Sequence, residues 1–321
     1  MVKKRFFRLQ LFYQISYKGA EIIAMTNARQ KTDQWVRILF FSVALASIAI
    51  LTMIMVFLFS EGLPIFKKVT LSGFIFGKYW YPTASPPDFG IFPLIVASIA
   101  VTLVSAVISI PLGVMTAIYL AELAQKRVAE IMKPVVELLA ALPSVVVGFF
   151  GMVVVAPFLQ NTFGIPTGLN LFNAALMLSF MSVPTICSLS EDAIYSVPVA
   201  LKEGSLALGA THWETLIRVI LPASISGIST AIILGMSRAI GETMVVLMVA
   251  VGAAMIPSSL MDPVRPMPAS IAAEMAEASF RGDHYYALFA TGIVLFLFTL
   301  LFNIIADHIA HKYRQTGEAS L

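Results

Sequence analysis

The sequence predicts an all-α polytopic membrane protein with six transmembrane helices, and its composition and hydropathy carry this prediction. Of the 321 residues, 59% are hydrophobic and only 12% are charged, and the mean hydropathy is +0.88. An ordinary soluble domain has about 25% charged residues. The net charge of +3 is small, and the basic residues gather near span ends. We therefore expect membrane lipid, and no nucleic acid, as a partner of the chain.

Six apolar runs reach the length of about 20 residues that a helix needs to cross the hydrocarbon core. Short segments with charged or turn-forming residues separate them. An even number of crossings places both termini on the same side of the membrane. The runs are 36–60, 92–120, 134–159, 171–190, 223–252 and 286–306.

The lysines and arginines predict which side faces the cytoplasm. Fifteen of the 21 lie in residues 1–37, in the loops 121–133 and 191–222, and in the C-terminal tail, whereas five lie on the other side. Basic residues next to short loops favour the cytoplasm. We therefore expect a multi-pass protein of the plasma (inner) membrane with both termini cytoplasmic.

Three regions follow from the spans. Residues 1–35 form a basic cytoplasmic tail that is expected to touch anionic lipid, residues 36–310 form the transmembrane domain, and residues 311–321 form a second cytoplasmic tail. No apolar core followed by a small-residue cleavage site precedes the first span, so a cleaved signal is not expected. Met25 is an alternative start.

Glycine and proline residues predict irregular backbone at several places. The outer segment 61–90 is rich in both and is expected to be a series of turns. Pro111, Pro143 and Pro184 lie within the second, third and fourth spans. Proline removes a backbone hydrogen bond and kinks a helix, which suits a translocation path but also occurs in purely structural bundles.

The fifth span contains two charged residues, Arg238 and Glu242, within an otherwise apolar or small run. Arg238 lies about 22 Å along a helix from Ala223, and a charge at that depth costs a few kcal/mol or more. Residues four apart share a helical face. One interpretation is a structural bridge between the two charges, and the other is a functional site.

In the functional interpretation, Arg238 faces a pore and attracts an anion. The planar guanidinium is permanently charged and matches tetrahedral oxyanions such as phosphate. Glu242 would then hold the arginine in place and compete for its donors, so that the anion is not trapped. Glu137, near the inner end of the third span, is expected to meet head-group water.

The loop 196–222 is too apolar to stand alone in water, although it lies on the predicted cytoplasmic side. Ser196 to Pro198 can begin a helix and Gly209 can end it. Thr211 and Glu214 have the spacing of a capping box that opens a second helix. The apolar face of that helix would consist of Trp213, Leu216, Ile217 and Ile220, and Pro222 would lead into the fifth span.

Either the membrane bundle or a soluble partner must cover this loop, and its pattern resembles a known docking element. The EAA loop of ABC importer permeases reads E-A-A, three residues, G, nine residues, then I-x-L-P. Glu203, Gly204 and Ser205 fill the first three places, Gly209 is the glycine, and Val219, Leu221 and Pro222 form the close. The resemblance implies a type I ABC importer permease fold in which this loop is a cytoplasmic coupling helix pair that docks on an ATPase. The pair is turned at Gly209, capped at Thr211 and closed at Leu221 and Pro222, and Glu203 to Gly209 would carry the contact.

The resemblance extends over nearly the whole chain after the N-terminal tail. Segments 62–66, 137–151, 237–243 and 269–278, with the run that begins at Phe89, are similar to the PstC family of phosphate importer permeases more than to its sister PstA family. This implies a permease that moves inorganic phosphate into the cytoplasm. The implied partners are an ATPase dimer, a second homologous (PstA-like) permease and an external phosphate-binding protein.

Several absences in the sequence agree with a transport subunit that is not itself an enzyme. No G-x-x-x-x-G-K-[ST] segment supplies a phosphate-cradling loop, so ATP is expected to be used by the partner and no cofactor to be bound by this chain. His308 and His311 beside Asp307 are expected to be a solvated helix end rather than a metal site. Cys187 is expected to be a small buried hydrophobe.

The sequence is also compatible with three other functions. A secondary transporter or anion channel would work without ATP and would use Glu242 as a proton relay. A membrane scaffold would need Arg238 only for folding. Within the importer class, sulfate or molybdate could replace phosphate, because one arginine does not select among tetrahedral anions.

Overall fold

The computed structural model describes residues 35–250 and 252–318. The chain divides into two compact units, one reaching to Phe57 and the other beginning at Leu58. Nearly all of the predicted tail 1–35 and the last residues of the predicted tail 311–321 lie outside the described residues.

The six predicted membrane spans are confirmed. Within the described residues, six helices are long and apolar enough to cross a membrane, although their bounds differ from the expected ones. They are Trp35–Lys67, Phe92–Leu123, Ser144–Phe163, Leu171–Tyr195, His212–Ile240 and Asp283–Ile305.

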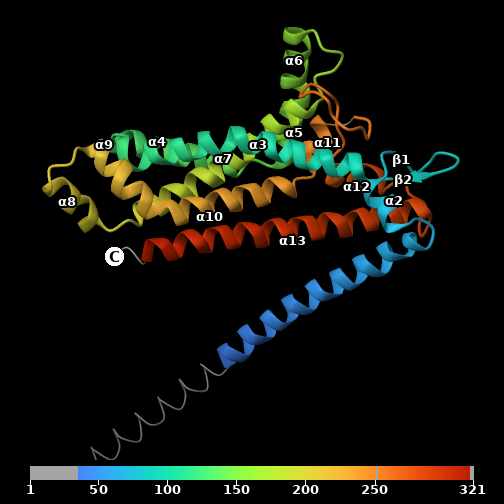
Figure 1. Cartoon of the computed structure of the whole chain (residues 1–321), viewed down its shortest axis with the longest axis horizontal. Coiled ribbons are helices and arrows are strands. Elements are labelled where there is room, and N and C mark those ends of the chain that lie inside the picture. Colours follow the sequence, from blue (N-terminus) through green and yellow to red (C-terminus); the bar gives the residue numbers. More distant parts are fainter. Residues whose placement is uncertain (1–34, 251, 319–321) are drawn as a thin grey trace, which may run out of the picture. The chain divides into compact units, whose positions relative to one another are not determined.

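The second unit is a bundle of long helices with shorter elements at both ends (Figure 1). The long helices are α3 (Phe92–Ile118), α7 (Leu171–Tyr195), α10 (Leu221–Ile240) and α13 (Asp283–Glu318). At one end, hereafter the hairpin end, lie η1 (Leu63–Lys67), α2 (Leu71–Phe76), the antiparallel pair β1 (Trp80–Tyr81) and β2 (Asp88–Phe89), and α12 (Met267–Glu274). At the other end, hereafter the α8 end, lie α8 (Val199–Ala207) and α9 (His212–Thr215). The remaining elements are α4 (Lys126–Ala140), α5 (Ser144–Phe150), α6 (Ala156–Phe163), α11 (Met244–Val249), and the π-helical turns η2 (Tyr119–Leu123), η3 (Gly151–Val155) and η4 (Leu216–Ile220).

The third span begins ten residues later than predicted. Residues 134–140 belong to α4, a separate amphipathic helix that ends before Pro143. A residue before proline is disfavoured in the helical region and proline has no donor for the preceding turn. The lysines and glutamates of α4 therefore lie outside the third span, which is Ser144–Phe163.

The fifth span also differs from the predicted range 223–252, at both ends. It begins at His212, because α9, η4 and α10 form one continuous helix. The π turn η4 ends two residues before Pro222, as η3 ends two residues before Pro157. A π turn is a local widening of the helix at which kinks are absorbed, so both prolines are accommodated without a break.

Prolines inside the second and fourth spans do not interrupt their helices. α3 continues through Pro111 and α7 through Pro184. The segment 61–90, in contrast, forms short ordered elements that its turn-rich composition did not predict.

The α3–α7 contact depends on small residues. Ser179 of α7 donates a hydrogen bond to the carbonyl oxygen of Ser105 of α3 at 3.1 Å. Further along both helices, a Cβ atom at Gly113 would lie 2.8 Å from Cγ2 of Ile186, and a Cβ at Gly235 of α10 would also meet the Ile186 side chain. Small residues allow helices to approach closely in membranes, so Ile186 packs against glycines on two neighbouring helices.

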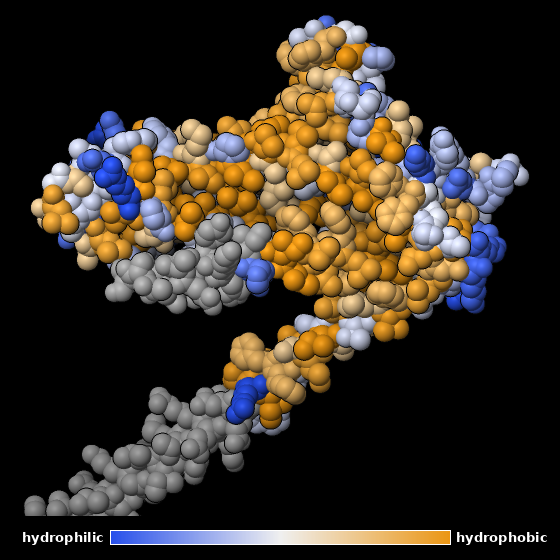
Figure 2. All heavy atoms as spheres, viewed as in Figure 1, coloured by the Kyte–Doolittle hydropathy of each residue, from blue (hydrophilic) through white to orange (hydrophobic). Residues whose placement is uncertain are grey.

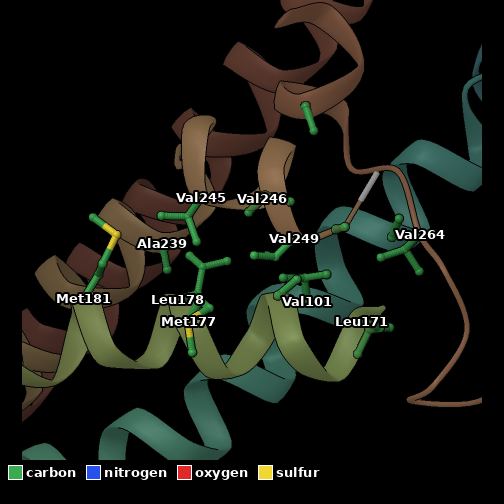
Figure 3. Packing of buried hydrophobic residues seen from close by; sticks show 14 of the residues in the cluster. Val101, Leu171, Met177, Leu178, Met181, Ala239, Val245, Val246, Val249 and Val264 are labelled. Atoms are coloured by element: carbon green, nitrogen blue, oxygen red, sulfur yellow. The ribbon is translucent and has the colours of Figure 1, made fainter. Parts of the chain in front are cut away.

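The core of the bundle continues from these helices to α11. Figure 3 shows side chains of α7 gathered with those of α3, α10 and α11. Figure 2 shows hydrophobic residues along the middle of the second unit and hydrophilic residues at its two ends, as expected for a membrane bundle. Labelled in Figure 3 are Val101, Leu171, Met177, Leu178, Met181, Ala239, Val245, Val246, Val249 and Val264.

Substitution of Gly113 by valine is expected to destabilise the bundle. The new side chain would overlap Ile186, and overpacking of this kind costs about 1–3 kcal/mol. The thermal unfolding midpoint of the protein purified in detergent should fall. The matched control is Gly204→Ala, where a Cβ meets nothing within 4 Å on helix α8, and its midpoint should stay or rise. Equal midpoints for Gly113→Val and the wild type would contradict the close contact.

Candidate functional site

The first half of the 196–222 loop is a short helix that ends in a left-handed glycine. Gly209 has φ +89° directly after α8. The amide of Gly209 donates to the carbonyl oxygen of Leu206, and that of Ala210 donates to Ser205 at 3.3 Å. This is the Schellman arrangement of a helix end, which favours glycine at this position. The prediction that Gly209 ends the helix is therefore confirmed.

The predicted capping box is confirmed in the second half of the loop. The Thr211 hydroxyl accepts from the amide of Glu214 at 3.2 Å, and the Glu214 carboxylate accepts from the amide of Thr211 at 2.9 Å. The first helix of the loop begins directly after Ser196 to Pro198, at Val199, but Ser196 does not cap it. The Ser196 hydroxyl instead donates to the carbonyl oxygen of Ala193, and Pro198 occupies the N-cap.

One side of the loop is exposed and largely apolar. No residue of α8, all of which is described, is buried. Glu203 and Gly204 are exposed, and the side chain of Leu208 is 92% exposed. Trp213, predicted to lie on an apolar face with Leu216 and Ile220, is 60% exposed, because only the latter two pack into the bundle. The loop thus presents unpartnered apolar side chains beside a carboxylate.

The opposite side of the loop contacts the bundle. Lys202 forms an ion pair with Glu122 of η2, and the Ser205 and Thr215 hydroxyls are 2.9 Å apart. Of the remaining predicted loop residues, Leu221 is half-buried and Pro222 is exposed, both within the continuous helix. The structure therefore places Glu203, Gly204 and Gly209 on the outer side and Ser205 on the inner side.

A second ion pair at the same end joins α4 to α7. Lys133 lies 3.4 Å from the buried carboxylate of Glu191 and 3.7 Å from Asp192. Burial lowers the pKa of Lys133, but the carboxylates of Glu191 and Asp192 raise it more, so the pKa lies above its ordinary value. The ammonium group therefore stays charged at neutral pH. Glu137 is exposed on α4 and lines a cavity of about 530 Å³ with Lys133 and Glu191.

The expected shared helical face of Arg238 and Glu242 is wrong. α10 ends at Ile240 with Gly241 as its C-cap, so the two residues do not lie on one helix. Oε1 of Glu242 accepts from the amides of Met244 and Val245 at the start of α11. Among the described residues, no ion pair joins Arg238 to Glu242, which contradicts both the structural bridge and the role of Glu242 as the holder of Arg238.

The exposed residues of α10 are of mixed character. Ile225 and Leu234 are large and apolar, whereas Thr230 and Arg238 are polar, and Ser237, next to Arg238 in the sequence, is half-buried. The exposed residues of α3 are by contrast large and apolar, as at Leu103, Val107, Leu112 and Met115. An exposed arginine on a membrane helix is costly against lipid and is found facing a bundle interior or water. The position of Arg238 is therefore suited to water or protein rather than to lipid.

Ser237, the residue before Arg238, contacts a polar residue that the sequence did not single out. Ser237 donates a hydrogen bond to Oδ1 of Asn303 on α13 at 2.6 Å. Asn303 is exposed and lies about 30 Å along α13 from Asp283. The sequence signal for this contact was Asn303, a single amide side chain in the apolar run of the last span. The sequence did not show which helix Asn303 would contact.

The hairpin end contains a hydrogen-bonded cluster that the sequence also did not predict. Glu274 accepts from Trp80 Nε1 at 3.0 Å, Arg265 Nη1 at 2.8 Å and Ser270 Oγ at 3.0 Å, and lies 2.9 Å from His284 Nε2. These partners come from β1, the loop before α12, α12 itself and α13. One carboxylate therefore fixes four segments together. Within the described part of the chain, no group of three or more His, Cys, Asp or Glu residues could hold a metal ion.

Comparisons with known proteins identify relatives across most of the chain. A family model described as binding-protein-dependent transport system inner membrane component matches residues 109–315. The chain is 36% identical to the probable ABC transporter permease protein YqgH of Bacillus subtilis, with 91% of this chain and 95% of that protein covered. It is 34% identical to the phosphate transport system permease protein PstC of Mesorhizobium japonicum (74% and 77% covered) and 30% identical to that of Haemophilus influenzae (91% and 99% covered).

Solved structures share the fold. A bacterial alginate ABC transporter, solved in complex with an alginate pentasaccharide-bound periplasmic protein, matches with a TM-score of 0.63 at 16% identity, covering 88% of this chain and 96% of that one. The MetNI methionine ABC transporter in inward-facing conformations matches with a TM-score of 0.53 at 20% identity, covering 70% and 94%. The type I ABC importer permease fold predicted from the sequence is thereby confirmed.

Removal of the Thr211 hydroxyl is expected to loosen the start of α9. Thr211→Ala deletes the acceptor for the Glu214 amide, and loss of such a cap costs about 1 kcal/mol, or roughly fivefold in local opening. Amide hydrogen exchange over residues 211–217 should accelerate accordingly. Thr211→Ser keeps the hydroxyl and should exchange at nearly the wild-type rate. Equal exchange in the alanine and serine variants would show that the cap does not stabilise the loop.

Proposed function

The chain belongs to the family of binding-protein-dependent transport system inner membrane components and is a transmembrane permease of an ABC importer, and we propose that it carries inorganic phosphate into the cytoplasm. Relatives named phosphate transport system permease protein PstC at 30–34% identity support this substrate.

The observation that carries the proposal is the exposed position of Arg238 on α10. The guanidinium offers a fork of donors and a permanent charge to a tetrahedral oxyanion. Ser237 and Asn303 add a neutral polar pair beside it, and the Asn303 side chain keeps amide donors in addition to the oxygen that accepts from Ser237. Glu242 follows Arg238 by four residues and accepts from the first amides of α11, and its charge would disfavour a second anion close to the first through like-charge repulsion.

The energy for transport is proposed to come from a separate ATPase dimer that docks on the 196–222 loop. The outer side of α8 combines the Glu203 carboxylate, the Gly204 backbone and the apolar side chain of Leu208, all exposed. A patch of this kind marks a protein contact when it lies outside the lipid. In this proposal the chain binds no cofactor and is not itself an enzyme, and ATP-driven closure of the ATPase pair moves the loop as a lever between outward and inward openings.

The remaining partners and the orientation follow the same proposal. The α8 end, with both tails 1–35 and 311–321, would face the cytoplasm, since most basic residues lie on that side. The hairpin end would receive an external phosphate-binding protein. A second, PstA-like permease would cover the side of α10 that carries Arg238. Together with the transmembrane domain 36–310 it would complete the substrate path.

Substitution of Arg238 by glutamine is expected to reduce phosphate uptake by about 10- to 100-fold, because a hydrogen bond to a charged group contributes about 1.5–3 kcal/mol. Uptake of labelled phosphate is measured in proteoliposomes that contain the purified complex and ATP. Arg238→Lys keeps the charge without the fork and should lose less activity.

Two outcomes would contradict this role of Arg238. Unchanged uptake by a normally assembled Arg238→Gln complex would remove the arginine from the path. Transport driven by an ion gradient without the ATPase would replace the importer mechanism, and equal uptake of labelled sulfate would replace the proposed substrate.

Substitution of Leu208 by aspartate is expected to weaken ATPase docking. The change places a second negative charge near Glu203 in the apolar part of the proposed contact. Co-purification of the ATPase with the tagged permease should fall markedly. Phe280→Asp likewise replaces an apolar side chain by aspartate, at a 76% exposed position at the hairpin end, and should leave co-purification intact. Equal losses in both variants, or in neither, would show that α8 is not the docking element.

A further inference from the structure

Few side chains of the coupling helix α8 contact the bundle, and Leu201 is the apolar one, packed on a buried cluster that includes Leu120 and Leu216. No residue of α8 is buried, and its half-buried residues are Leu201, Lys202 and Ser205, on the side that faces the bundle. The Ser205 hydroxyl bonds to the Thr215 hydroxyl of α9, so this contact joins α8 only to the next helix of the same loop. Lys202 instead reaches a different part of the molecule, the carboxylate of Glu122.

We propose that the Lys202–Glu122 ion pair transmits the displacement of α8 to α3, so that ATP hydrolysis by the partner is coupled to movement of the bundle. This inference rests on the proposed docking of an ATPase at α8 and adds the residues that carry its motion inward. Lys202 and Glu122 are positioning residues, since neither touches the substrate path described above.

The surroundings of the pair suit this task. The side chains of Lys202 and Glu122 are 23% and 17% exposed, so solvent screens their attraction less than that of a surface pair. Glu122 lies in η2, which continues α3 without interruption from Phe92 to Leu123. A force on the Glu122 carboxylate therefore acts directly on the end of a membrane-crossing helix.

α3 connects that end to the opposite side of the bundle. Along its length it packs closely on α7, at the Ser105–Ser179 hydrogen bond and at Gly113. At the hairpin end, Ile91 and Leu94 are fully buried in a cluster with Met267 and Leu288. Densely packed interiors move as units rather than deform continuously. Displacement of Glu122 would thus move the hairpin end and α7, and through Ile186 also α10, the helix that carries Arg238.

The chain offers a matched control. Lys133 and Glu191 form another lysine–glutamate pair at the same end of the bundle, 3.4 Å apart, but they join α4 to α7 and involve no residue of α8. A general weakening of that end by loss of an ion pair should appear in both pairs. A loss of coupling should appear only when the pair that includes Lys202 is changed.

The experiment measures ATP hydrolysis and phosphate uptake separately in proteoliposomes that contain the whole complex. The variants are Lys202→Met and Glu122→Gln, each removing one charge while keeping much of the side-chain volume, the charge exchange Lys202→Glu with Glu122→Lys, and the control Lys133→Met. The ATPase should co-purify with the two single variants and hydrolyse ATP, while phosphate imported per ATP falls about tenfold, within the range of a coupling energy between sites. The charge exchange should restore at least half of the lost ratio, and Lys133→Met should leave it near the wild-type value.

The inference is overturned if the single variants keep the wild-type ratio, if the exchange restores nothing, or if Lys133→Met uncouples the complex equally. Should Lys202→Met accumulate poorly, Lys202→Arg, which keeps the charge, must retain coupling while Lys202→Gln loses it. Failure of the underlying docking proposal is distinguishable, because the ATPase would then still co-purify with Leu208→Asp, whatever the Lys202 variants do.

Discussion

The close contact between α3 and α7 is the interaction on which the rest of the second unit depends. Serines and a glycine on the facing sides let the helices approach until Ser105 and Ser179 are hydrogen-bonded and Ile186 meets Gly113. In a membrane, helix association relies on such packing because lipid tails are as apolar as the side chains they replace. The same isoleucine faces Gly235 of α10, so one side chain aligns three spans. Arg238 of α10 is left exposed in this arrangement.

The charged side chains have different roles at the two ends of the second unit and in its middle. At the α8 end, the lysines Lys133 and Lys202 join neighbouring elements to α7 and to the end of α3. At the hairpin end, Glu274 fixes four segments in one hydrogen-bonded cluster. Between them, Arg238 has its side chain exposed on α10. No ion pair of Arg238 is found among residues 35–250 and 252–318, and an exposed charge is expensive in lipid. This is the physical reason to expect water, substrate or a second subunit beside Arg238.

Local sequence signals predicted the elements whose cause is local. Gly209 and the Thr211–Glu214 pair formed the expected turn and cap, because a left-handed glycine and a capping box are set by a few adjacent residues. The breaks at Pro143 and Gly241 were missed, since hydropathy is equally high on both sides of each break. The continuity of the helix through Pro222 was missed for the opposite reason, as a π turn before the proline has no clear sequence signal. The expected pairing of Arg238 with Glu242 was wrong because it required one helix through both residues, and α10 ends at Ile240.

The sequence by itself determined the membrane environment, the six spans and the capped helical loop, because apolar length, basic residues and cap geometry act over short distances. Only the tertiary structure decided which side of each helix is exposed and which charges meet. Glu122 and Lys202 are 80 residues apart, as Ser237 and Asn303 are 66 apart. Such pairs arise from the packing of whole helices, in which each partner is chosen by the shape and small residues of a neighbouring span rather than by its own sequence surroundings.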